Sequence, residues 1–81
     1  MNFDIIKRAG IYHREFAKLV GVSRVTVSLW VLGRQTPSPL ARDKAQSVLD
    51  AIEAATTAGN LPLVGRGPHR QKVLDQLLLP R

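Results

Sequence analysis

The stretch that decides the fold runs from His13 to Gly33 and reads HREFAKLVGVSRVTVSLWVLG. Its apolar residues fall into two short runs at helical spacing, and Gly21 lies in the turn between them. The first run predicts a helix over 13–20. Ser23 is a good N-cap residue, so the second helix is expected to begin after it and to end near Leu32. The stretch therefore predicts two short helices joined by a tight turn.

Glycines also mark the ends of the flanking helices. Gly10 and Gly59 each follow a segment of helical periodicity, which predicts helices over about 3–9 and 39–58. A last helix is expected over about 68–79, where apolar residues again recur at helical spacing. The chain is therefore expected to be all-α. The inner stripe expected for the longest helix is Leu40, Ala41, Ala45, Val48, Leu49, Ile52 and Ala55.

The 13–33 stretch resembles the helix-turn-helix of the phage Cro and repressor proteins, the Xre-type family. Ala17 stands where that family needs a small residue because its two helices cross closely, and Gly21 follows in the turn. The resemblance extends over about residues 3–58. It implies a compact four-to-five-helix, lambda-repressor-like helix-turn-helix domain, to which this chain adds a C-terminal extension. The family's buried positions are matched by Val22, Val27 and Trp30.

The start of the first helix in this stretch departs from the family pattern. The family usually places Ser or Thr before this helix, whereas Tyr12 stands there in this chain. We therefore expect a weaker helix cap. Glu15, in the first turn, favours the helix dipole.

The resemblance implies that the helix over 24–32 enters the major groove of double-stranded DNA. Arg24, on its first turn, is the candidate for a bidentate contact to guanine. For each candidate the alternative is a surface residue that is solvated or packs against protein. The expected base contacts are Arg24, Val25, Ser28 and Leu29. The expected phosphate contacts, which fix register without reading sequence, are His13, Ser23, Thr26, Arg34, Gln35 and Thr36.

Charge is distributed unevenly along the chain, whose formal net charge is +6. Residues 1–44 hold eight Lys or Arg against three Asp or Glu, whereas residues 45–63 hold two acidic residues and no Lys or Arg. A basic N-terminal half beside a mildly acidic segment suggests a surface that faces a polyanion such as DNA.

The C-terminal extension is expected to serve dimerisation. We divide the chain into a helix-turn-helix domain over 1–58 and a linker with a C-terminal helix over 59–81. The extension carries more apolar surface than a small four-helix core is expected to bury. The alternative, that its stripe folds back onto the long helix within one chain, stays open. The candidate dimerisation residues are Leu61, Leu63, Val73, Leu74, Leu77 and Leu78.

The sequence therefore predicts a Cro-like or repressor-like transcription regulator that binds a palindromic operator as a homodimer. Two other functions stay open. One is a DNA-binding antitoxin whose C-terminal helix neutralises a toxin. The other is a phage adaptor that binds the host transcription machinery through its helix-turn-helix surface.

Several other classes of function are not expected. The chain has no cysteine and two histidines without metal-ligand spacing, so we expect no metal, no cofactor and no enzymatic activity. No small-molecule ligand is indicated. No apolar run approaches the roughly 18 residues that span a bilayer. A cytoplasmic location is expected, in a bacterial cell or a phage-infected host.

Overall fold

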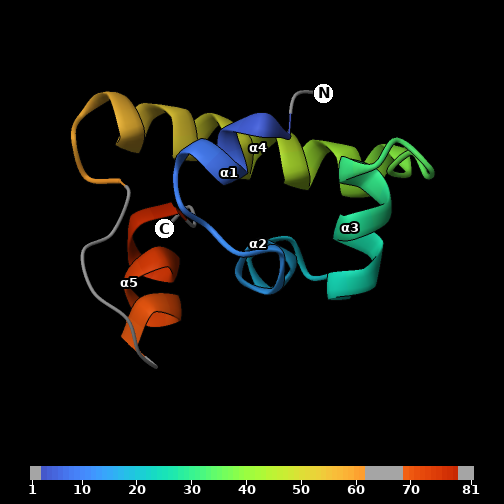
Figure 1. The fold of residues 1–81 in the computed structure, drawn as a ribbon, viewed down its shortest axis with the longest axis horizontal. Coiled ribbons are helices and arrows are strands. Elements are labelled where there is room, and N and C mark those ends of the chain that lie inside the picture. The colour runs from blue at the N-terminus through green and yellow to red at the C-terminus, as the bar shows by residue number, and fades with distance from the viewer. Residues whose placement is uncertain (1–2, 62–68, 79–81) are drawn as a thin grey trace.

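The computed structural model describes residues 3–61 and 69–78, which form five helices and no strand (Figure 1). Each helix begins and ends within one residue of the bounds that the sequence predicts, and the all-α class is confirmed. Leu63, a candidate for dimerisation, lies outside the described residues. The helices are α1 (Asp4–Arg8), α2 (His13–Val20), α3 (Arg24–Val31), α4 (Pro39–Thr57) and α5 (His69–Leu78).

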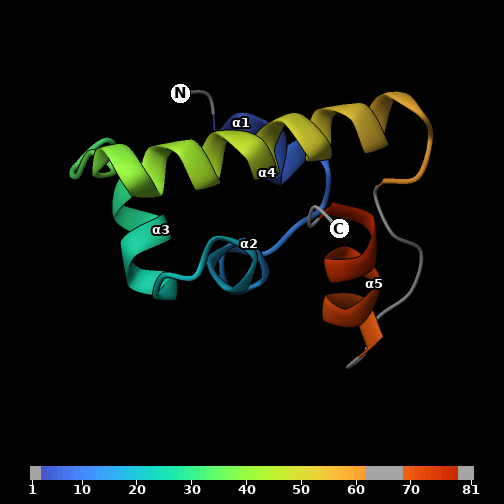
Figure 2. The ribbon, with the colours of Figure 1, turned by 180° about the vertical axis from the view of Figure 1, so that it is seen from behind.

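The long helix α4 forms one side of the molecule, and α1 lies along it (Figures 1 and 2). Helix α2 lies on the other side of this layer, between α3 and α5 in both views. It contacts α3, α4 and α5, so it is the central element of the fold. Helix α2 of the 13–33 stretch is thus held from both sides, with α3 on one side and α5 on the other.

The turn between α2 and α3 is built as the sequence predicts. Gly21 ends α2 in the left-handed region at φ 91°, and its N–H donates to the Ala17 carbonyl at 2.8 Å. Ser23 then caps α3, because its Oγ accepts the Thr26 N–H at 3.1 Å. Three residues therefore suffice to redirect the chain from one helix into the next.

The core between these helices is aromatic. Phe16 and Trp30 are buried, and the Phe3 ring packs against both of them. Its centroid lies 6.2 Å from that of Phe16, edge to face, and 6.1 Å from that of Trp30, nearly parallel. The expected core positions are confirmed, since Ala17, Val27 and Trp30 are buried and Val22 is partly buried against them.

The start of α4 differs from the prediction. Ala45 to Ala55 of the expected stripe are buried and Ala41 is partly buried, but the Leu40 side chain is 84% exposed. The reason is geometric: Leu40 lies on the same face of the helix as Lys44 and Ser47, which are both exposed. The inner stripe of α4 therefore begins at Ala41, one residue later than the sequence pattern indicates.

In the structure most of the described candidate dimerisation residues pack within one chain, which is the alternative that the sequence left open. Leu61, Leu74 and Leu78 are buried in the same core as the first four helices, and Leu77 packs partly against it. Only Val73 among the described candidates is exposed, at 41%. Helix α5 packs on α2 and α4 of its own chain, so residues 1–58 and 59–81 do not have separate cores. The sequence shows the surplus of apolar surface but not which surface covers it.

Candidate nucleic-acid interface

Helix α3 separates a buried face from an exposed one. Val27 and Trp30 point into the core, while Arg24 and Val25 on its first turn are exposed. Ser28 and Leu29, the other two expected base contacts, are half-buried. Within residues 3–61 and 69–78 the Arg24 guanidinium has no ion-pair partner. The exposed end of α3 therefore presents a cation and an apolar side chain.

His13 and Ser28 meet across the two helices. The His13 Nδ1 and the Ser28 Oγ lie 3.0 Å apart, at hydrogen-bond distance, although the residues are 15 positions apart in sequence. The sequence predicts separate contacts with DNA for them, His13 with a phosphate and Ser28 with a base. A hydroxyl has one donor and two acceptor sites, so this bond leaves Ser28 able to make another. The start of α2 is thereby tied to the middle of α3.

The other expected phosphate contacts lie at the surface at both ends of α3. At its start, the Ser23 and Thr26 hydroxyls are 2.8 Å apart, in addition to the capping bond. After its end, Arg34, Gln35 and Thr36 are exposed in the connection to α4. The basic residues of the N-terminal half are all exposed, so their positive field reaches the solvent. They are Lys7, Arg8, Arg14, Lys18, Arg24, Arg34, Arg42 and Lys44.

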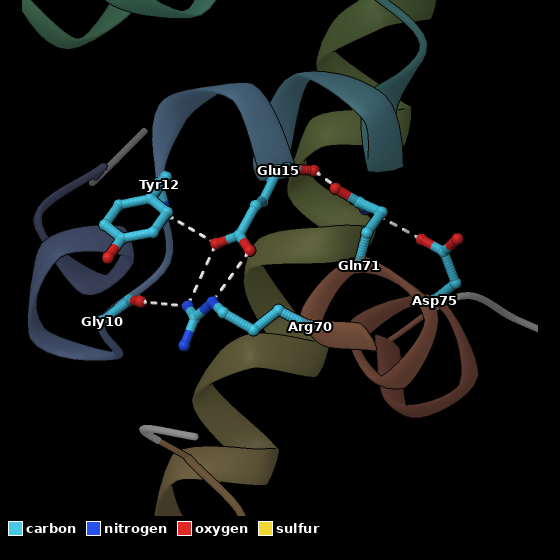
Figure 3. A network of polar contacts seen from close by, with 6 residues as sticks. All are labelled: Gly10, Tyr12, Glu15, Arg70, Gln71 and Asp75. Carbon is cyan, nitrogen blue, oxygen red and sulfur yellow. Dashed lines mark hydrogen bonds and ion pairs between the residues drawn. The ribbon is translucent and has the colours of Figure 1, made fainter. Parts of the chain in front are cut away.

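The start of α2 has a cap that the sequence did not predict. The Tyr12 N–H donates to the Glu15 Oε1 at 2.9 Å, so the carboxylate supplies the half of a capping box that does not need a Ser or Thr hydroxyl. Glu15 itself is buried, with its side chain 4% exposed. Its charge is compensated by Arg70 of α5, whose Nε lies 3.0 Å from the Glu15 Oε2 (Figure 3).

The surroundings of Glu15 keep it ionised. Burial alone raises the pKa of this carboxyl, but the hydrogen bonds from Arg70 and from the Tyr12 N–H outweigh that effect. The positive charges of Arg70 and Arg14 act in the same direction. The pKa of Glu15 is therefore lower than its ordinary value of 4.5. At neutral pH this site holds a full ion pair.

Among the described residues, no group of three or more His, Cys, Asp or Glu is placed to hold a metal ion. None of the helices described is both long enough and apolar enough to cross a bilayer. Comparisons with protein-family models, with curated proteins and with solved structures gave no significant match. The functional interpretation therefore depends on the chain's own residues and geometry.

Proposed function

We propose that this chain is a sequence-specific DNA-binding transcription regulator in which α2, the turn and α3 act as a helix-turn-helix. The observation that supports this most directly is the division of α3 into two faces. Val27 and Trp30 fix one face in the core, while Arg24 and Val25 project from the first turn of the other. In a helix-turn-helix, residues at this end of the second helix meet base edges in the major groove.

The proposal includes a homodimer that reads two half-sites of a palindromic operator about one helical turn apart. Such a regulator acts where the DNA is, in the cytoplasm of a bacterial cell or a phage-infected host. The net charge of +6 supports the attraction to duplex DNA that precedes sequence reading. Arg24 is the proposed contact to guanine, with Ser28 and Leu29 deeper in the same face.

The experiment that tests this function is selection of bound duplexes from a random DNA pool, with binding measured at several salt concentrations. Enrichment of a palindromic motif supports both specificity and dimerisation. The logarithm of the affinity is expected to fall linearly with the logarithm of salt concentration, because phosphate contacts release counterions. Absence of any enriched motif at low salt would overturn the proposal.

The Arg24 contact gives the first prediction. The change Arg24→Ala is expected to reduce discrimination at one base pair per half-site by about 1–3 kcal/mol. The measurement is affinity for the selected operator and for a series of single base-pair variants. Arg42→Ala is the matched control: it removes an exposed arginine from the first turns of α4, on a different helix from the proposed base contacts. Equal behaviour of the two variants at every base pair would contradict the assigned contact.

A protein-binding function is the second candidate, because two leucines are exposed at the surface. Leu32, just after α3, and Leu40, in the first turn of α4, both remain exposed. Such side chains suit either the second copy of a homodimer or the partner of an adaptor protein. The antitoxin alternative gains no comparable support, because Leu74 and Leu78 of α5 are buried in the chain's own core.

These leucines give the second prediction. The double change Leu32→Ser and Leu40→Ser is expected to alter the free energy of unfolding by less than about 0.5 kcal/mol, because both sites are at the surface. It is expected to shift the chain toward monomer in sedimentation equilibrium and to weaken binding to a full operator more than to a half-site. An unchanged self-association constant would exclude this surface as the homodimer contact. If both self-association and DNA binding were unchanged, the result would favour the alternative in which this surface binds a partner protein, as in an adaptor.

A further inference from the structure

Arg70 lies outside the α2–α3 unit, yet its guanidinium closes over the start of α2 (Figure 3). It makes three hydrogen bonds there: Nε to the Glu15 Oε2 at 3.0 Å, and Nη2 to the Glu15 Oε1 at 3.1 Å and to the Gly10 carbonyl at 2.7 Å. The side chain is only 12% exposed. A forked cation that engages both a carboxylate and a backbone carbonyl fixes the distance between them.

The groups that Arg70 holds determine how the chain enters α2. Gly10 belongs to the connection before the helix, and the Glu15 carboxylate holds the Tyr12 N–H at the helix start. The Arg70 Cζ also lies 5.0 Å from the centroid of the Tyr12 ring, a cation–π distance. Gln71, the next residue on α5, donates from Nε2 to the Glu15 carbonyl at 3.4 Å. Helix α5 thus contacts this entrance at several points.

The start of α2 also lies next to the proposed DNA contacts. His13 follows Tyr12 in the chain, and its ring is within hydrogen-bond distance of Ser28 on α3. A contiguous series of contacts therefore runs from α5, through Glu15 and the start of α2, to the face that carries the proposed phosphate and base contacts. Small displacements at such a point are costly, because binding depends on groups held in place before the ligand arrives.

We propose that Arg70 is a positioning residue for DNA binding: it holds the start of α2 so that His13 meets a phosphate and Ser28 is oriented on α3. This inference depends on the proposed function. It assigns α5 a role within one chain, in which this helix holds the start of α2 in position. Arg70 itself does not have to touch DNA, since its guanidinium is already engaged by Glu15 and Gly10.

The decisive variant is the double change Glu15→Gln and Arg70→Met. It removes the ion pair without leaving either charge buried alone, so the chain is expected to stay folded, and the net charge is unchanged. Affinity for the selected operator is expected to fall about 2- to 30-fold, the range for changes that act on a site through intervening contacts. Circular dichroism and a thermal unfolding curve establish the folded fraction, by which the affinity is corrected.

A double-mutant cycle with His13→Ala separates positioning from a general loss of structure. If Arg70 acts through the start of α2, removing the ion pair costs less affinity in the His13→Ala background than in the wild type. Additive losses would overturn the proposal. So would wild-type affinity in the folded Glu15→Gln, Arg70→Met variant.

Lys72→Ala is the matched control on α5. It removes an exposed cation from the same helix and is expected to bind the operator as the wild type does. A loss equal to that of the ion-pair variant would show that α5 contacts DNA by its charge, and would overturn the positioning role. Failure of the wild-type chain to bind any selected duplex is a separate result, since it overturns the proposed function itself.

Discussion

Replacing Arg70 with alanine is expected to lower the free energy of unfolding by about 3 kcal/mol. The change leaves the Glu15 carboxylate, 4% exposed, without its compensating charge. Removing one member of a buried ion pair typically costs about 3–5 kcal/mol. The lower end applies here because Arg70 lies at the edge of the site, 12% exposed, so its truncation admits water to the carboxylate. Urea denaturation followed by circular dichroism at pH 7 measures the effect.

Two variants accompany this measurement. Lys72→Ala, at an exposed position on the same helix, is expected to change stability by no more than about 0.5 kcal/mol. Adding Glu15→Gln to Arg70→Ala is expected to recover part of the loss, because the buried charge is then gone. A cost below about 1 kcal/mol for Arg70→Ala would contradict the buried ion pair.

The pH dependence of the same variants follows from the lowered pKa of Glu15. The unfolded chain protonates this carboxyl near its ordinary pKa of 4.5, whereas the folded chain keeps it ionised to lower pH. The stabilisation is therefore fully present above the ordinary pKa and is lost as the pH falls through the folded pKa. The difference between wild type and Arg70→Ala is expected to shrink as acid protonates the Glu15 carboxyl, first in the variant, which lacks the partner that lowers its pKa, and then in the wild type. A difference that stays constant into acid would show that Glu15 is not its source.

The helices were predictable because their signals are local. A glycine after each of the first four helical segments and the caps Ser23 and Ser38 each act over a few residues, and all four glycines adopt positive φ. The core of the α2–α3 pair was predictable for the same reason. Ala17, Val27 and Trp30 lie at fixed offsets within one short stretch. Their spacing matches the buried positions of the helix-turn-helix family that the stretch resembles, so a short local pattern was enough to place them on an inner face.

The contacts of α5 were not predictable in this way. Arg70 and Glu15 are 55 positions apart, and no pattern in the sequence pairs these two residues among the other charged ones. The His13–Ser28 contact depends in the same way on how α2 and α3 cross. The exposure of Leu40 depends on which face of α4 the neighbouring helices cover. Each of these features is set by the tertiary arrangement, which hydrophobic periodicity does not encode.

The α5 contacts also change how the proposed regulator is understood. If the C-terminal helix served only dimerisation, the proposed DNA-contacting unit would have to be stable with four helices alone. Instead, α5 and α3 lie on opposite sides of α2, and leucines of α5 complete the core beneath it (Figures 1 and 2). A chain of this size buries a modest fraction of its surface, so a fifth helix packed in cis is a substantial part of its stability.

Replacing Leu74 with alanine tests that packing directly. Leu74 is fully buried, at 0% exposure, so the change is expected to cost about 2–5 kcal/mol through lost burial and the cavity left behind. Val73→Ala, at the adjacent and 41% exposed position, is the matched control and is expected to cost well under 1 kcal/mol. Thermal unfolding followed by circular dichroism measures both.

Protein concentration separates the two roles of this stripe. If Leu74 packs within one chain, the loss of stability is the same across a hundredfold range of protein concentration. If the stripe instead joins two chains, the midpoint of unfolding depends on concentration, and Leu74→Ala removes that dependence. A dimer interface would also make Val73, the exposed member of the stripe, as costly to replace as its buried neighbour. Either result would show that α5 forms a dimer interface, and it would contradict the proposal that α5 positions the start of α2 within one chain.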